Sequence, residues 1–293
     1  MKLLSFGEVL FDIDGRDACI GGAPLNLAAH LTLQGWESYV VSAVGDDELG
    51  KRAISEIEKI GIGTSYINIL PDRETGKCIV TLDENSVPTY DLLTDMAYDH
   101  IKYPKLDGKF DILAFGTLAL RMEPNTEVIK RIIQSNSFAE IYTDLNIRMP
   151  FCCERNILFC LENATILKIS DEELPYVSEA VFGKSYACGE ICPLFSDKFP
   201  QLKIIIITAG DKGAYAYTCE DERLYFCEGE KVNVISTVGA GDSFGAAFLA
   251  KYFEGEDIQA CLEFASGISA FVVANKGAVP DGMKEYIRDC INK

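Results

Sequence analysis

The sequence predicts an α/β fold: a three-layer α/β/α sandwich with a mostly parallel sheet and a small antiparallel β lid. Six segments fit strands, and most of them are nearly continuous apolar runs, as expected of strands that are covered on both faces. Helical patterns lie between most of these runs, so successive strands would be joined by right-handed crossovers. The length of 293 residues favours one large domain, over residues 1–293, with a small additional element.

The expected elements alternate along the chain. The strands are Lys2–Leu10, Ser38–Ala43, Phe110–Phe115, Ala139–Asp144, Ala164–Ile169 and Leu202–Thr208. The helices are Pro24–Leu33, Asp46–Ile60, Pro124–Gln134 and Ser185–Phe199. Apolar residues recur on one face of Asp46–Ile60, and Gly61, a typical helix-ending residue, follows directly. After Thr208 we expect two short strands (AYAYTC, RLYFCE) and then three helices.

Residues 66–93 depart from this alternation. They hold three short β-type runs (YINIL, KCIVTL, TYDLL), with turn residues at 71–72 and 84–86 and no helical pattern between them. We therefore expect a small antiparallel insertion. In an α/β enzyme such an insertion commonly serves as a lid or a contact surface, which makes it the candidate interface of a homodimer.

Composition excludes several classes of partner. The net charge is −18 and no basic cluster is present, which argues against nucleic acid and acidic membrane surfaces. No apolar run reaches the roughly 18 residues needed to span a bilayer, and Gly7 and Glu8 interrupt any signal-peptide core. We expect a cytoplasmic protein. Its eleven cysteines are expected to be free, largely buried thiols, and His30 and His100 to be structural or solvated.

Two glycine-containing segments are candidates for a functional site. In STVGAGDSFG (236–245), Asp242 follows Gly239-Ala240-Gly241 at an expected helix start, where bare N–H groups attract anions. Asp242 either caps this helix or has a chemical role. In GGAPLNLAA (21–29), the glycines either let the backbone approach a ligand or only shape a turn, and Asn26 offers donors and acceptors. The Walker phosphate loop and the dinucleotide fingerprint are both absent, which disfavours an oxidoreductase.

Together, GGAPLNLA and TVGAGDSF resemble the two signatures of the ribokinase-type sugar kinases, the PfkB family. Other segments follow in order along essentially the whole chain: GEVLFD, FGTLALR, DLNIRMPF, LKISDEEL, TAGDKGAY and NKGAVPDG. Within the family, the fructokinases look most similar. The resemblance implies a ribokinase-like fold and transfer of the γ-phosphate of ATP to a sugar hydroxyl, most readily of fructose. ATP and Mg²⁺ would be the cofactors.

The resemblance also implies roles for matching residues. Asp242 would be the base that takes a proton from the sugar hydroxyl. The backbone anion hole for the transferring phosphoryl group would be formed by Gly239, Ala240 and Gly241. The residues expected to contact the sugar are Asp12, Gly21, Gly22 and Asn26. Those expected to meet phosphate charge or line the nucleotide cleft are Arg148, Lys168, Thr208, Gly210 and Gly277; Arg148 and Lys168 could instead be surface cations.

Two positions depart from the family pattern. Ser170 replaces the asparagine of an Asn-x-x-Glu motif, so Glu173 would serve magnesium through water, or would simply belong to an acidic helix start. Ser236 replaces an aspartate that holds potassium in many relatives. Other substrates (ribose, 2-keto-3-deoxygluconate or a nucleoside) remain alternatives. So does a non-catalytic sugar sensor, although a sensor has no use for Asp242 beside phosphate.

Overall fold

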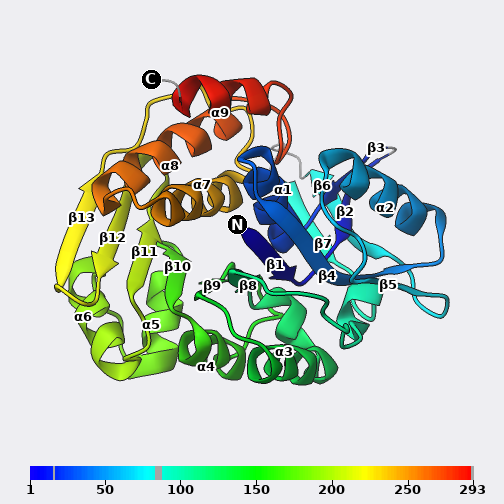
Figure 1. The fold of residues 1–293 in the computed structure, drawn as a ribbon, viewed down its shortest axis with the longest axis horizontal. Coiled ribbons are helices and arrows are strands. Elements are labelled where there is room, and N and C mark those ends of the chain that lie inside the picture. The colour runs from blue at the N-terminus through cyan, green and yellow to red at the C-terminus, as the bar shows by residue number, and fades with distance from the viewer. Residues whose placement is uncertain (16, 83–87, 292–293) are drawn as a thin grey trace.

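The computed structural model describes residues 1–15, 17–82 and 88–291, and its centre is a nine-stranded sheet (Figure 1). The strand order is β13-β12-β11-β10-β9-β8-β1-β4-β5. The bounds are β1 Lys2–Phe6, β4 Glu37–Gly45, β5 Ile67–Leu70, β8 Ile112–Phe115, β9 Glu140–Asp144, β10 Ile166–Ser170, β11 Ile204–Thr208, β12 Ala214–Thr218 and β13 Arg223–Cys227. Every neighbouring pair from β11 to β5 is parallel, and β12 is antiparallel to both of its neighbours. The predicted mostly parallel sheet is confirmed.

Helices cover both faces of this sheet, which confirms the three-layer sandwich. One layer holds α1 Ala23–Leu33, α2 Glu48–Ile60, α7 Ala240–Glu254, α8 Ile258–Val273 and α9 Met283–Ile291. The other holds α3 Glu123–Ser135, α4 Glu154–Asn163, α5 Leu174–Phe182 and α6 Cys188–Lys198. Figure 1 shows α7 and α8 on one side of the sheet and α3 and α4 on the other. Because side chains alternate along a strand, Leu3 enters the first core and Leu4 the second.

A second, four-stranded sheet has the order β3-β2-β6-β7. Its strands are β2 Leu10–Asp14, β3 Asp17–Gly21, β6 Gly76–Leu82 and β7 Pro88–Leu92. It therefore differs from the expected insertion at 66–93: two strands come from the N-terminal segment, and Ile67–Leu70 pairs with β4 in the large sheet. The β2–β6 pair is parallel, and the other two pairs are antiparallel. The turn expected at 84–86 lies outside the described residues, and a homodimer through this sheet stays a prediction.

The N-terminal strand also ends earlier than expected. The single strand anticipated over Lys2–Leu10 is two strands in different sheets, β1 and β2. Gly7 lies between them with φ 153°, and a Cβ at this position would be 2.5 Å from Cγ of Pro24. The chain can turn out of the large sheet here because position 7 carries no side chain.

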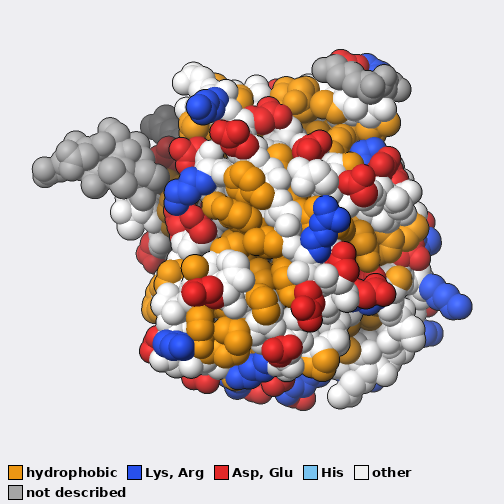
Figure 2. All heavy atoms as spheres, turned by 90° about the vertical axis from the view of Figure 1, so that its left-hand side faces the viewer, with side chains coloured by type: hydrophobic (Ala, Val, Ile, Leu, Met, Phe, Trp, Pro, Cys, Tyr) orange, Lys and Arg blue, Asp and Glu red, His pale blue; other side chains and the backbone are white. Residues whose placement is uncertain are grey.

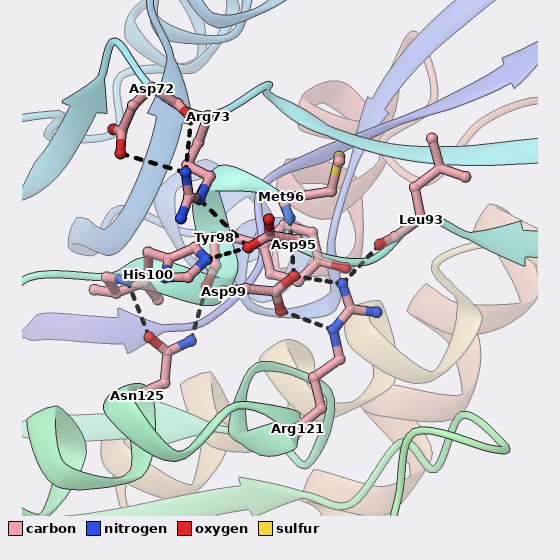
Figure 3. A network of polar contacts seen from close by, with 11 residues as sticks. Asp72, Arg73, Leu93, Asp95, Met96, Tyr98, Asp99, His100, Arg121 and Asn125 are labelled. Carbon is pink, nitrogen blue, oxygen red and sulfur yellow. Dashed lines mark hydrogen bonds and ion pairs between the residues drawn. The ribbon is translucent and has the colours of Figure 1, made fainter.

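A buried ion pair joins the small sheet to the body of the molecule (Figure 3). The Arg121 guanidinium donates from Nε and Nη2 to both carboxylate oxygens of Asp99, each at 2.7 Å, and also to the carbonyl of Leu93, just past β7. Its Cζ atom lies over the rings of Tyr98 and Phe151, at 4.9 and 4.8 Å from their centroids. Arg121 thus links the end of β7 to two short 3₁₀ helices, Ala97–His100 and Leu118–Arg121.

The surface and the cysteines agree with the composition. On the face around β13, basic side chains lie among acidic ones (Figure 2). In the part of the chain that the structure describes, no helix combines the length and apolarity needed to cross a bilayer. All eleven cysteines are free, as predicted, but only five of them are buried.

Candidate active site

The candidate site lies where the carboxyl ends of β9 and β10 meet the start of α7. Asp144 and Lys168 are paired in register on these strands, and Lys168 Nζ donates to Asp144 Oδ2 at 2.7 Å. Burial alone would lower the pKa of Lys168, but the Asp144 carboxylate outweighs this effect and the pKa is raised. A Cβ at Gly241 would lie 3.1 Å from Lys168 Nζ. The ammonium group of Lys168 therefore lies against the first turn of α7.

The first turn of α7 is suited to an anion. Gly239 is the N-cap with φ 80°, and a Cβ there would be 2.6 Å from Cα of Ala278, so only glycine fits. The helix begins at Ala240, whose N–H donates to the carbonyl of Thr237 at 3.2 Å. The next N–H groups, starting with that of Gly241, belong to the helix end that carries partial positive charge and lacks partners within the helix. Together with the Lys168 ammonium, these N–H groups are the hydrogen-bond donors that an anion could meet at the start of α7.

Asp242 lies in this turn but does not act as the helix N-cap. Its Oδ2 accepts a hydrogen bond from Asn26 Nδ2 of α1 at 2.7 Å. The pKa of Asp242 is raised to about 6, chiefly by burial and then by the Asp144 carboxylate, while the hydrogen bond from Asn26 and the charges of Lys168 and Arg148 oppose the rise. At neutral pH the carboxylate is therefore ionised yet far more basic than an ordinary aspartate. That combination suits a general base.

Sequence reasoning missed a second buried carboxylate, Glu8, which lies beside the Gly21-Gly22 segment. Glu8 is 5% exposed and accepts a hydrogen bond from the Ala23 N–H at 3.1 Å. Gly22 has φ 122°, and a Cβ there would be only 2.2 Å from the Glu8 carbonyl oxygen, so the close approach requires glycine. Burial raises the pKa of Glu8 to about 7, and the charge of Asp242 contributes to the rise. Its only signal in the sequence was its place in GEVLFD.

The small sheet brings Asp12 to the same region. Asp12 lies on β2, and a Cβ at Gly21 would be 3.4 Å from its Oδ2. Burial raises the pKa of Asp12, while a hydrogen bond from Cys78 and the charge of Arg148 oppose the rise. Arg148 is exposed, and its charge also acts on Glu8 and Asp242. Arg148, expected to meet phosphate charge, therefore lies near Asp12, which was expected to contact the sugar, and near Asp242, the expected base.

A cleft of about 560 Å³ opens on the other side of the α7 start. Its lining includes Thr208 and Gly210, together with Ala240 and Gly241. That a nucleotide binds in this cleft stays a prediction. Its apolar lining residues include Val232, Val234, Phe244, Ala270 and Val273. Gly277 does not line it, and instead precedes Ala278, the residue that packs against Gly239.

The carboxylate of Glu173 is hydrogen-bonded to the backbone of two neighbouring segments. One of its carboxylate oxygens accepts from the Ser170 N–H at 2.8 Å, and the other accepts from the Ile147 N–H. Ser170 Oγ in turn accepts from the Glu173 N–H at 3.2 Å. Within the described ranges, no group of three or more histidine, cysteine or acidic side chains could hold a metal. These residues do not form a protein cage for Mg²⁺.

A family model provides the deciding comparison: the model of pfkB family carbohydrate kinases matches residues 15–284. The chain belongs to this family. Its members are phosphotransferases that use an alcohol group as acceptor, so this pfkB protein is a sugar kinase.

Individual relatives agree with the family. The pfkB chain is 27% identical to probable fructokinase-5 of Arabidopsis thaliana, over 95% of this chain and 93% of that protein. A sugar kinase of Pyrococcus horikoshii, solved in complex with ATP, is 26% identical with a TM-score of 0.78, covering 94% of this chain and 93% of the other. The fructokinase of Vibrio cholerae O395, solved with fructose, ADP and calcium, shares the fold: TM-score 0.82, 21% identity and 98% of both chains.

Ser236 gives a testable difference within the pfkB family. Its Oγ accepts from the Val238 N–H at 3.3 Å, and it lacks the charge of the aspartate expected to hold potassium. A unit charge pair at about 4 Å is worth about 4 kcal/mol at an effective dielectric of about 20, before desolvation. In a bulky organic-cation buffer with magnesium ATP, we therefore expect potassium chloride to raise the kinase rate less than about threefold.

The variant Ser236→Asp is expected to create or strengthen activation by potassium. Sodium and choline chloride at matched ionic strength serve as controls. A large potassium-specific activation of the unchanged pfkB protein would show that backbone carbonyls hold the cation without a carboxylate.

Proposed function

We propose that this chain is an ATP-dependent kinase that phosphorylates a sugar hydroxyl, with fructose as the preferred sugar. One observation supports the proposal: two adjacent residues at the start of α7 lie on two different sides of the site. Gly241 lines the large cleft, whereas Asp242 is hydrogen-bonded to Asn26, beside the expected sugar contacts. A nucleotide in the cleft and a sugar beside Asn26 would therefore meet at this turn.

The proposed reaction uses this meeting point directly. The sugar hydroxyl oxygen attacks the γ-phosphorus of ATP, the bond between that phosphorus and the β,γ-bridging oxygen breaks, and ADP leaves. Asp242 accepts the hydroxyl proton as the new O–P bond forms. The N–H groups of the α7 start and the Lys168 ammonium stabilise the charge on the transferring group. Positioning and charge stabilisation supply most of the rate in this chemistry, which fits a site built from fixed backbone and buried charge.

The choice of ATP and fructose rests on similarity. The Pyrococcus kinase was solved with ATP, and the Arabidopsis relative is described as a probable fructokinase. Mg²⁺ is proposed to arrive with the phosphates of ATP, because it commonly binds proteins through substrate phosphates and only one or two carboxylates. Ribose, 2-keto-3-deoxygluconate and nucleosides stay as alternative acceptors.

A panel of sugars assayed for ADP release tests the proposal. We expect fructose to give a higher kcat/KM than ribose, and Asp12→Ala to raise the KM for the sugar sharply, because sites that hydrogen-bond a substrate depend on each partner. Asp14→Ala is the matched control, since Asp14 ends the same strand β2 but is exposed.

Three outcomes separate the hypotheses. A preference for ribose or a nucleoside would refute fructose and retain the kinase. Equal effects of Asp12→Ala and Asp14→Ala would refute Asp12 as a sugar contact. Sugar binding with no ADP release for any sugar would favour the sensor.

A further inference from the structure

A buried histidine contacts the loop that lies against the start of α7. His30, in the last turn of α1, is fully buried, and its Nε2 lies 2.8 Å from the carbonyl oxygen of Ala278. The other ring nitrogen, Nδ1, is buried and has no hydrogen-bond partner among the described residues. A carbonyl oxygen only accepts hydrogen bonds, so the ring donates from Nε2.

The ring of His30 is uncharged at neutral pH. Burial lowers its pKa to about 4, and the hydrogen bond to Ala278 offsets only part of this effect. A neutral imidazole carries one N–H, which here must be on Nε2. His30 therefore supplies a single donor, and this donor is directed at one carbonyl.

The carbonyl that accepts this bond belongs to the residue that borders Gly239. A Cβ at Gly239 would lie 2.6 Å from Cα, 2.7 Å from Cβ and 2.9 Å from the carbonyl oxygen of Ala278. The oxygen bonded to His30 is thus one of the atoms packed against the N-cap of α7. Gly239 has φ 80°, and its conformation sets the direction in which the first N–H groups of the helix point.

Few hydrogen bonds hold this loop in place. Ala278 lies in the connection between α8 and α9, where the N–H groups of residues 276–279 donate to no other described residue. Of the four carbonyls in this stretch, that of Ala278 alone accepts a hydrogen bond within the described structure, and the donor is His30. The position of Ala278 against Gly239 therefore depends on this bond and on packing.

The same helix contacts the start of α7 at a second point. Asn26 lies four residues before His30, so both side chains are on one face of α1. Asn26 donates to Asp242, whereas His30 donates to Ala278, which borders Gly239. One face of α1 is thereby connected both to the expected base and to the first residue of the expected anion hole.

We propose that His30 is a positioning residue for phosphoryl transfer: through Ala278, it holds Gly239 and the first N–H groups of α7 in the geometry that receives the transferring group. The effect on the rate rests on the proposed function, because it takes these N–H groups to be the anion hole. The hydrogen bond and the position of Ala278 do not depend on that function.

The test compares His30→Gln with His30→Asn. The amide nitrogen of glutamine occupies nearly the same position as Nε2 of histidine, so His30→Gln retains the donor to Ala278. Asparagine is one bond shorter and does not reach the carbonyl. We expect His30→Asn to lower kcat about tenfold or more, because small displacements of catalytic groups are costly, while the KM for the sugar changes less than about twofold. His30→Gln should keep kcat within about threefold of the unchanged protein.

Ser178→Ala is the control for a loss of stability alone. It removes another buried hydrogen bond from a side chain to a carbonyl, that of Ser178 Oγ to Lys184 at 2.7 Å, in the opposite helix layer. Melting temperatures are measured for all three variants, and kinetics well below them. We expect Ser178→Ala to lower the melting temperature without changing kcat. Equal kcat values for His30→Asn and His30→Gln would overturn the proposal, and so would an equal loss of kcat in Ser178→Ala.

Crystal structures of the two His30 variants test the positioning without any activity. We expect Ala278 to remain against Gly239 in His30→Gln and to move away from it in His30→Asn. An unchanged arrangement of Ala278 and Gly239 in His30→Asn would contradict the role of His30. If no sugar is phosphorylated by the unchanged protein, the proposed function fails, and the crystal structures still decide whether His30 positions the loop.

Discussion

Replacing Asp242 by asparagine is expected to lower the turnover of sugar phosphorylation by about 10²–10⁴-fold, the usual contribution of a positioned base. The asparagine side chain has nearly the same shape, so the protein should still fold. It cannot accept the proton from the hydroxyl, because an amide is not basic. The measurement is kcat from coupled ADP release, together with ATP binding by calorimetry and the melting temperature.

The control for this variant is Asp281→Asn, which removes the same charge from an exposed position. We expect its turnover to match the unchanged protein. Turnover of Asp242→Asn within a few-fold of the unchanged protein would rule out Asp242 as the base. Loss of ATP binding would instead indicate that the substitution disturbs the α7 start as a whole.

Arg121→Met is expected to lower the free energy of unfolding by about 3–5 kcal/mol, because it leaves the buried Asp99 carboxylate without its cation. Asp99 is fully buried, and Arg121 is the cation paired with it in the described structure. Methionine retains apolar contact with the rings of Tyr98 and Phe151 but cannot donate to the Leu93 carbonyl. Urea denaturation followed by fluorescence or circular dichroism measures the change.

Two further variants identify the cause. Adding Asp99→Asn to Arg121→Met removes the unpaired charge and should restore part of the lost stability. Arg131→Met is the matched control, because Arg131 is exposed and lies over the ring of Tyr103, 3.8 Å from its centroid; we expect it to cost about 1 kcal/mol or less. Equal losses for Arg121→Met and Arg131→Met would contradict the role assigned to the buried pair.

The large sheet could be predicted because its strands are apolar on both faces. The small sheet could be predicted only in part. Its existence followed from the short β-type runs around KCIVTL. Which strands belong to it depends on Gly7, where the backbone turns within an apolar sequence that has the pattern of a single strand. The parallel pairing of β2 with β6 joins distant segments, and no local pattern encodes it. Two helices, α4 and α5, were not among the expected elements, although LKISDEEL suggested an acidic helix start near α5.

The candidate site shows the same limit. Motif matching found Asp242 and Asn26, and the structure brings them within hydrogen-bonding distance. Motif matching did not select Asp144, although DLNIRMPF contains this residue. The importance of Asp144 comes from strand register, because it lies opposite Lys168 in the neighbouring parallel strand. Motif matching also did not predict that both carboxylate oxygens of Glu173 accept hydrogen bonds from backbone N–H groups. Such assignments depend on three-dimensional pairing that one sequence does not display.

The bond between Asn26 and Asp242 joins positions 216 residues apart, which has a consequence for synthesis of the chain. The ribosome releases α1 long before α7 is synthesised. During this time the apolar side of α1, which includes Leu25, Leu27 and Leu31, is not covered by α7. Until then this surface is open to chaperones or to other unfinished chains. A nascent chain that stops short of residue 242 would therefore be both inactive and prone to aggregate.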